Sequence, residues 1–159
     1  MRNWGIGLSV ILLLLSFCCQ KKEPTKKAFE ERKEPGAAAE IDVQKVEAAT
    51  GISFKILKTE AVGFMPRHNF FWVCVPERAS KEKIEGLASA IIKETIAANP
   101  AAFHSVTIHF FSESELGTTV EASKAFARPT FLPEGNWVKV GRVPIDDYKD
   151  YVLNCVFLD

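Results

Sequence analysis

A strand–helix–strand unit between Asn69 and Phe111 constrains the fold of this chain more than any other stretch. The two outer parts, Asn69–Val75 and His104–Phe111, are rich in the aromatic and β-branched residues that favour strands. Between them, Ser80–Ala98 places apolar residues at the i, i+3, i+4, i+7 spacing of an amphipathic helix. A crossover helix of this kind predicts two parallel strands with a right-handed connection. The unit therefore predicts a fold class, but it carries no chemistry.

The two strands of this unit differ in how they are expected to be covered. Asn69–Val75 is apolar on both faces, which is typical of a central strand buried on both sides. In His104–Phe111 the even-numbered residues, His104 included, are expected to face the core. The odd-numbered residues, among them His109 and Phe111, are expected on the opposite face.

The rest of the folded part predicts shorter elements around this unit. A proline within a strand suits an edge position, because no neighbour needs its missing N–H, so Pro129 predicts an edge strand. Together with the strand–helix–strand unit, these elements predict a two-layer α+β domain at residues 41–159, with a mixed sheet of about five to six strands and one long helix packed on it. The additional elements are a short helix at 41–50, a strand at 52–59, an edge strand at 124–131, a hairpin strand at 137–143 and a last strand at 151–157.

Charge limits the class of partner. Twenty basic and twenty acidic residues give a formal net charge of zero, which argues against binding nucleic acid by bulk electrostatics. The interaction expected instead is with an unidentified protein or small ligand.

The first nineteen residues read as a targeting segment. Arg2 precedes an apolar run from Ile6 to Phe17, which is shorter than the ~20 residues of a membrane span but has the length of a signal-peptide core. Two adjacent cysteines, Cys18 and Cys19, end the run. Residues 20–40, dense in charge and with two prolines, predict a flexible tether between this segment and the domain.

An apolar run that ends in cysteine and continues into a charged stretch resembles a bacterial lipoprotein signal. The triplets before the two cysteines are Leu15-Ser16-Phe17 and Ser16-Phe17-Cys18, so either cysteine could be the lipidated one, and the relaxed motif is similar to that of spirochaetal lipoproteins. The resemblance implies acyl chains, such as palmitate, that anchor the protein to a bilayer of the cell envelope, the outer membrane where a cell has two. An ordinary secretory signal is the alternative. The segment 131–137 is also similar to a hairpin of small bacterial lipoprotein domains that have no assigned function.

Few residues suggest catalysis, a cofactor or a metal. His104 and His109 lie five apart on one predicted strand and so point to opposite faces, which prevents them from sharing a metal ion. No nucleophile motif or glycine-rich phosphate loop occurs in the mature part, and no cofactor is expected. Cys74 and Cys155 lie in separate predicted strands, where they could form a disulfide or be two buried thiols.

One set of residues suggests a binding surface. If the long helix covers one sheet face, aromatic side chains on the other need a cover, which the 41–50 helix or the 112–123 segment could supply, or else a partner. The leading hypothesis is a non-enzymatic binding module. A structural lipoprotein without a ligand and an enzyme with a site around His104 and His109 are the alternatives. The candidate surface consists of Phe70, Trp72, His109, Phe111 and Trp137.

Overall fold

The computed structural model describes residues 41–63, 66–98, 103–145 and 148–158. Its five strands form one sheet in which spatial order follows chain order. β2 and β3 are parallel, and every other neighbouring pair is antiparallel. The predicted α+β class with a mixed sheet is therefore confirmed. The strands are β1 (Lys55–Val62), β2 (His68–Val75), β3 (Ser105–Ser112), β4 (Ala127–Pro133) and β5 (Tyr151–Phe157).

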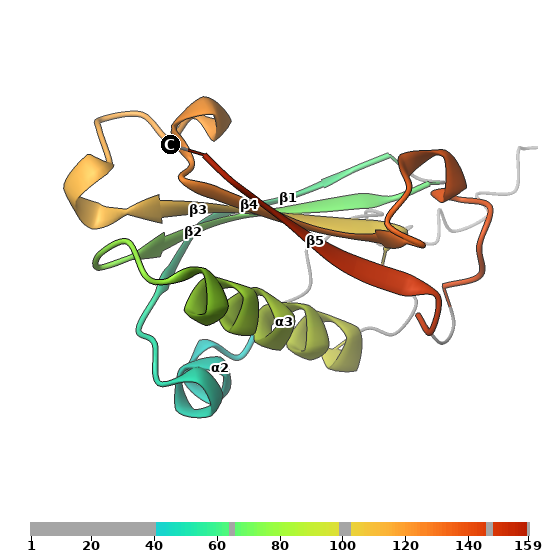
Figure 1. Cartoon of the computed structure of the whole chain (residues 1–159), viewed down its shortest axis with the longest axis horizontal. Helices are drawn as coiled ribbons and strands as arrows, with labels where there is room; N and C mark the ends of the chain where they lie inside the picture. Colours follow the sequence, from blue (N-terminus) through green and yellow to red (C-terminus); the bar gives the residue numbers. More distant parts are fainter. Residues whose placement is uncertain (1–40, 64–65, 99–102, 146–147, 159) are drawn as a thin grey trace, which may run out of the picture. The chain divides into compact units, whose positions relative to one another are not determined.

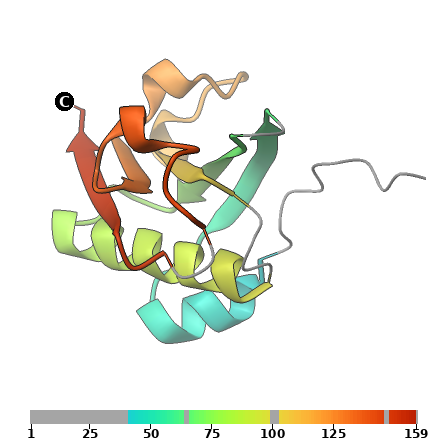
Figure 2. The same cartoon turned by 90° about the vertical axis from the view of Figure 1, so that its right-hand side faces the viewer.

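Both helices, α2 (Val43–Thr50) and α3 (Lys81–Ala98), lie on the same side of the sheet (Figures 1 and 2). α3 is the crossover between the parallel strands β2 and β3, as its apolar spacing predicted. Burial of each large apolar side chain on its stripe contributes roughly 1.5–3 kcal/mol, which makes this packing the main support of the fold. The buried residues of α3 are Ile84, Leu87, Ala88, Ile91, Ile92 and Thr95.

The short helix α2 is capped at both ends by the residues that flank it. The Asp42 carboxylate accepts a hydrogen bond from the Lys45 backbone N–H at 3.1 Å, which satisfies one free donor of the first turn. Gly51 adopts φ 66° and donates its N–H to the Glu47 carbonyl, a left-handed cap that glycine accommodates without strain. α2 packs on α3 and does not reach the other face of the sheet.

Strand β1 begins later and ends later than the sequence indicated. The expected strand covered residues 52–59, whereas β1 runs from Lys55 to Val62 and pairs with β2 as far as Val62 opposite His68. The register shifts between Ile56 and Lys58, so that Leu57 turns towards the face opposite the helices. A period-two pattern cannot show such a bulge in advance.

The position predicted for the strand with Pro129 is wrong. β4 lies between β3 and β5, not at an edge. Its pairing with β5 is continuous and includes Pro129 opposite Cys155, whereas its pairs with β3 skip Arg128 and Pro129. The missing N–H of the proline thus falls in a local gap of the β3–β4 ladder, which is how an interior strand accommodates it.

The stretch expected as a hairpin strand at residues 137–143 is not a strand. After a turn at Glu134 and Gly135, the chain forms a short 3-10 helix, η3 (Trp137–Lys139), and further turns. The Asn136 side chain accepts from the Val138 N–H at 2.9 Å, and this cap favours the helical turn over an extended chain. β5 takes the place beside β4, so the sheet has five strands and not six.

Candidate functional site

The sheet face away from the helices carries the residues that the sequence marked as a surface. The β2–β3 register sets Phe70 beside Thr107 and Trp72 beside His109, with all four side chains on this face. Figure 1 shows the chain between β3 and β4 rising over this face at one end of the sheet, and the η3 region rising at the other. Residues of the β2–β3 centre therefore lie between two loops.

Three aromatic rings form a stack at this centre. The Trp72 and His109 rings lie 5.3 Å apart between centroids with an interplanar angle of 27°, and the Phe70 and His109 rings lie 6.4 Å apart at 16°. The Lys58 ammonium lies 4.7 Å from the centroid of the Trp72 ring, a cation–π contact from β1. The stack fixes the plane of the His109 ring.

Part of this aromatic face is covered from within the chain. Trp72 and Phe111 are buried together with Ala125, and Leu116 packs against them. The 112–123 segment that supplies Leu116 was one of the two covers expected from the sequence. The other, the 41–50 helix, lies on the opposite side of the sheet. The aromatic cluster is thus largely interior.

Trp137 does not belong to this cluster. It lies on η3 with 53% of its surface exposed, and its ring is 5.8 Å from that of His68. Four of the five residues of the candidate surface, Phe70, Trp72, His109 and Phe111, come together. Trp137 was grouped with them because residues 137–143 were interpreted as a sheet strand.

His109 is the polar residue at the centre of the stack. It is only 5% exposed, and its Nδ1 atom is buried without a hydrogen-bond partner in the described structure. Burial, with a smaller contribution from the charge of Arg128, lowers the pKa of His109 from 6.5 to about 4. The imidazole is therefore neutral at neutral pH, with one nitrogen that donates and one that accepts.

Arg128 faces His109 from the neighbouring strand. The β3–β4 pairs Thr107 with Thr130 and Phe110 with Ala127 place Arg128 opposite His109. Its Nη2 donates to the Ala122 carbonyl at 3.1 Å, but its Nε is buried and has no partner in the described structure. None of the ion pairs among the described residues includes Arg128. A partly buried cation without a counter-ion thus lies beside an unpartnered imidazole nitrogen.

Sequence reasoning missed Arg128. The signal that could have found it is its place in the alternation of residues 126–132, where an arginine is the one charged side chain. Its proximity to His109, however, depends on which strands pair. The residues around Arg128 do not show that its strand pairs with the strand of His109.

The other two histidines lie at the starts of their strands, away from His109. The Nδ1 of His104 accepts the Arg67 backbone N–H at 2.9 Å, and the Nδ1 of His68 lies 2.7 Å from the Ser105 hydroxyl. Burial lowers the pKa of both imidazoles. His104 precedes β3 and does not join its core face as expected. Within the described ranges, no three His, Cys, Asp or Glu side chains gather in a way that could hold a metal ion.

The disulfide between Cys74 and Cys155 that the sequence allowed does not form, because both thiols are free. β2 and β5 are separated by two strands, or about 14 Å at the usual strand spacing, whereas bonded cysteines have Cα atoms less than about 7 Å apart. Burial raises the pKa of both thiols, that of Cys155 to about 11, so neither is a ready nucleophile.

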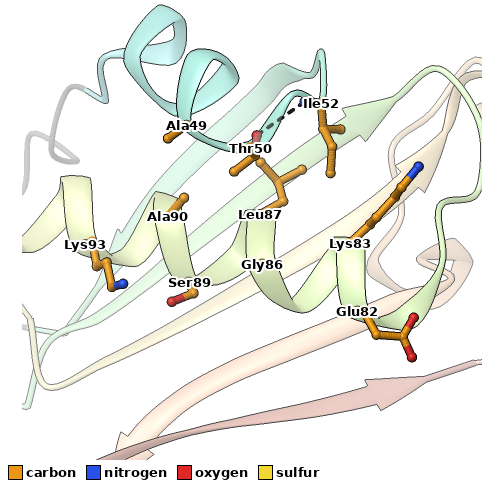
Figure 3. Close-up of a pocket in the computed structure, with 10 residues that line it drawn as sticks. All are labelled: Ala49, Thr50, Ile52, Glu82, Lys83, Gly86, Leu87, Ser89, Ala90 and Lys93. Carbon is orange, nitrogen blue, oxygen red and sulfur yellow. Dashed lines mark hydrogen bonds between the residues drawn. The ribbon is translucent and has the colours of Figure 1, made fainter.

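A groove of about 510 Å³ lies between α2 and α3 on the other side of the molecule. Figure 3 shows Leu87 and Ala90 pointing from α3 towards Thr50 and Ala49 at the end of α2. Gly86 is one of its lining residues, and a Cβ there would meet no atom within 4 Å. None of its lining residues has a buried side-chain polar atom without a partner. The pair of His109 and Arg128 is therefore the stronger candidate.

Comparisons with models of protein families, with curated proteins and with solved structures find no match to this chain. Neither helix of the described part combines the length and apolarity that crossing a membrane requires.

Proposed function

We propose that this protein is a lipid-anchored, non-enzymatic binding module of the bacterial envelope, and that the pair of Arg128 and His109 holds a small anion. The lipid anchor rests on the lipoprotein-like signal that ends at Cys18 or Cys19. The anion site rests on one observation, the partly buried Arg128 without an ion pair among the described residues, with its Nε and the Nδ1 of His109 both unpartnered.

The charges at this site favour an anion. An arginine guanidinium keeps its positive charge and presents its N–H groups in a fixed plane that matches carboxylate and phosphate oxygens. His109 is neutral, so it adds no second charge and can donate one hydrogen bond from its ring. A carboxylate or a phosphate would satisfy both groups, and a planar part of the same ligand could extend along Phe70.

The same features favour binding over catalysis. A general base works best when its pKa lies near the operating pH, whereas the pKa of His109 is about 4. Among the described residues, the charged group that acts on the pKa of His109 is Arg128, which lowers it, and no carboxylate raises its basicity. An enzyme site around His104 and His109 has less support, because the two rings lie in different surroundings.

Isothermal titration of the protein with inorganic phosphate, and separately with acetate, tests this proposal. Binding should shift the NMR signals of the His109 ring, and Arg128→Gln should weaken the affinity at least about tenfold, since a charge-assisted hydrogen bond is worth roughly 1.5–3 kcal/mol. Arg142→Gln is the matched control, because Arg142 is an exposed arginine in the turn after η3.

The two anions distinguish a carboxylate ligand from a phosphate. Equal affinity in the Arg128→Gln and Arg142→Gln variants, or His109 signals that do not move with either anion, would refute the anion site. A structural lipoprotein without a ligand would then be the better interpretation.

A further inference from the structure

The two edges of the sheet are built differently. Edge strand β1 carries Lys55, Lys58 and Glu60, and a bulge interrupts its pairing with β2. Charges and bulges at an edge are the usual devices that prevent another strand from adding to it. β5, at the other edge, has neither, since it contains no charged residue, glycine or proline and pairs with β4 in one unbroken register. The β1 edge is therefore protected against the addition of another strand, whereas the β5 edge is not.

The free edge of β5 presents backbone groups that can bond to another strand. The Leu158 N–H donates to the Phe126 carbonyl at 2.8 Å, so the polar groups of the even-numbered residues point towards β4. By alternation, the N–H and C=O groups of Leu153 and Cys155 point away from the sheet. No described strand lies on that side. The side chains of Val152 and Val156, exposed by 46% and 55%, flank this edge on the face away from the helices.

The sequence of β5 is chemically symmetric about its centre, Asn154. Residues at equal distances before and after Asn154 have similar character in size and polarity. An antiparallel copy of the same strand would therefore bring like apolar residues together with no charge opposed to another charge. The matched pairs are Val152 with Val156, Leu153 with Cys155, and Tyr151 with Phe157.

We infer that β5 pairs with β5 of a second copy of this chain, antiparallel about a two-fold axis at Asn154, to form one continuous ten-stranded sheet. In this register Leu153 lies opposite Cys155 of the second copy, and these are the residues whose backbone groups point outward. The interface is isologous, as in most homodimers. It is also small, so we expect a dissociation constant on the order of 10 μM. The inference is independent of the anion site.

Sedimentation of the full chain in detergent, at roughly 5 to 200 μM, tests the dimer. The double variant Val152→Lys/Val156→Lys should raise the dissociation constant at least about tenfold, because its ammonium groups lie beside one another across the axis. Val62→Lys is the matched control, since Val62 is 45% exposed on β1, the strand at the opposite edge of the sheet. A wild-type protein that stays monomeric throughout, or a double variant that dimerises as the control does, would overturn the inference.

A cysteine placed at the axis tests the register without relying on the charged variant. Directly opposed residues of a non-hydrogen-bonded antiparallel pair have Cα atoms about 4.5 Å apart, which suits a disulfide. In a Cys155→Ala background, Asn154→Cys should cross-link two chains on mild oxidation. Val156→Cys should not, because the two copies of residue 156 lie about 14 Å apart in this register. Equal cross-linking at both positions, or at neither, would contradict the proposed pairing.

Discussion

His109 makes the stability of the folded chain depend on pH. Its pKa is about 4 in the folded protein and 6.5 when unfolded, so the unfolded state binds more protons between these values. This contribution to stability is complete above about pH 6.5 and is lost as the pH falls towards 4. We expect the free energy of unfolding to drop by about 2 kcal/mol from this residue between pH 7 and pH 5.

Urea denaturation of wild type and His109→Phe at these two pH values measures this contribution. Phenylalanine keeps an aromatic ring against Trp72 and Phe70 but cannot bind a proton, so the variant should lose stability less steeply on acidification. His68 and His104 remain in both proteins, and their lowered pKa values give both the same background. An equal loss in the two proteins would mean that protonation of His109 is not penalised by its burial.

Alanine substitutions at two glycines of the helices should change the stability of the protein in opposite directions. Gly86 lies inside α3, where a Cβ would meet no atom within 4 Å, so Gly86→Ala should stabilise the protein by about 1 kcal/mol. Gly51 is equally unobstructed, but its φ of 66° is left-handed, so Gly51→Ala should destabilise it by about 1 kcal/mol. Thermal unfolding of both variants measures the difference. A Gly86→Ala variant that melts below wild type would show that the groove must stay open for the helices to pack.

Elements with a strong local signal were predictable, and those decided by their neighbours were not. The spacing in α3 and the caps of α2 specify their own conformation, and the helices predicted at residues 80–98 and 41–50 are both present. Pro129 and the stretch after Asn136 were misplaced because each depends on a distant partner. Pro129 is tolerated because the β3–β4 ladder opens locally, and β5 displaces residues 137–143 from the sheet. Alternation identified the face of His109, but only the pairing of β3 with β4 brings Arg128 opposite it.

The proposed binding site and the inferred dimer contact occupy different parts of one sheet. The two helices cover one face, the His109 and Arg128 pair lies on the other, and the inferred dimer uses the β5 edge. Neither the His109 and Arg128 pair nor the β5 edge includes the start of the described chain at Ile41, which follows the segment predicted to be a tether. Cys18 and Cys19 themselves lie outside the described residues. This separation means that anchoring can be tested without disturbing either site.

Substitution of the cysteine that we propose to be lipidated should release the protein from the membrane. Acyl chains bind a bilayer with about 0.8 kcal/mol for each buried CH₂ group, and the sequence from residue 20 to residue 158 contains no apolar run as long as Ile6–Phe17. Cys18→Ser and Cys19→Ser, made singly and together, should differ, because only the acceptor incorporates labelled palmitate. The double variant should carry no label and leave the membrane fraction, whereas Cys74→Ala, which changes a cysteine of the folded sheet, should keep both label and location. A double variant that still carries palmitate would eliminate lipidation at this signal, and the ordinary secretory signal would then explain residues 1–19.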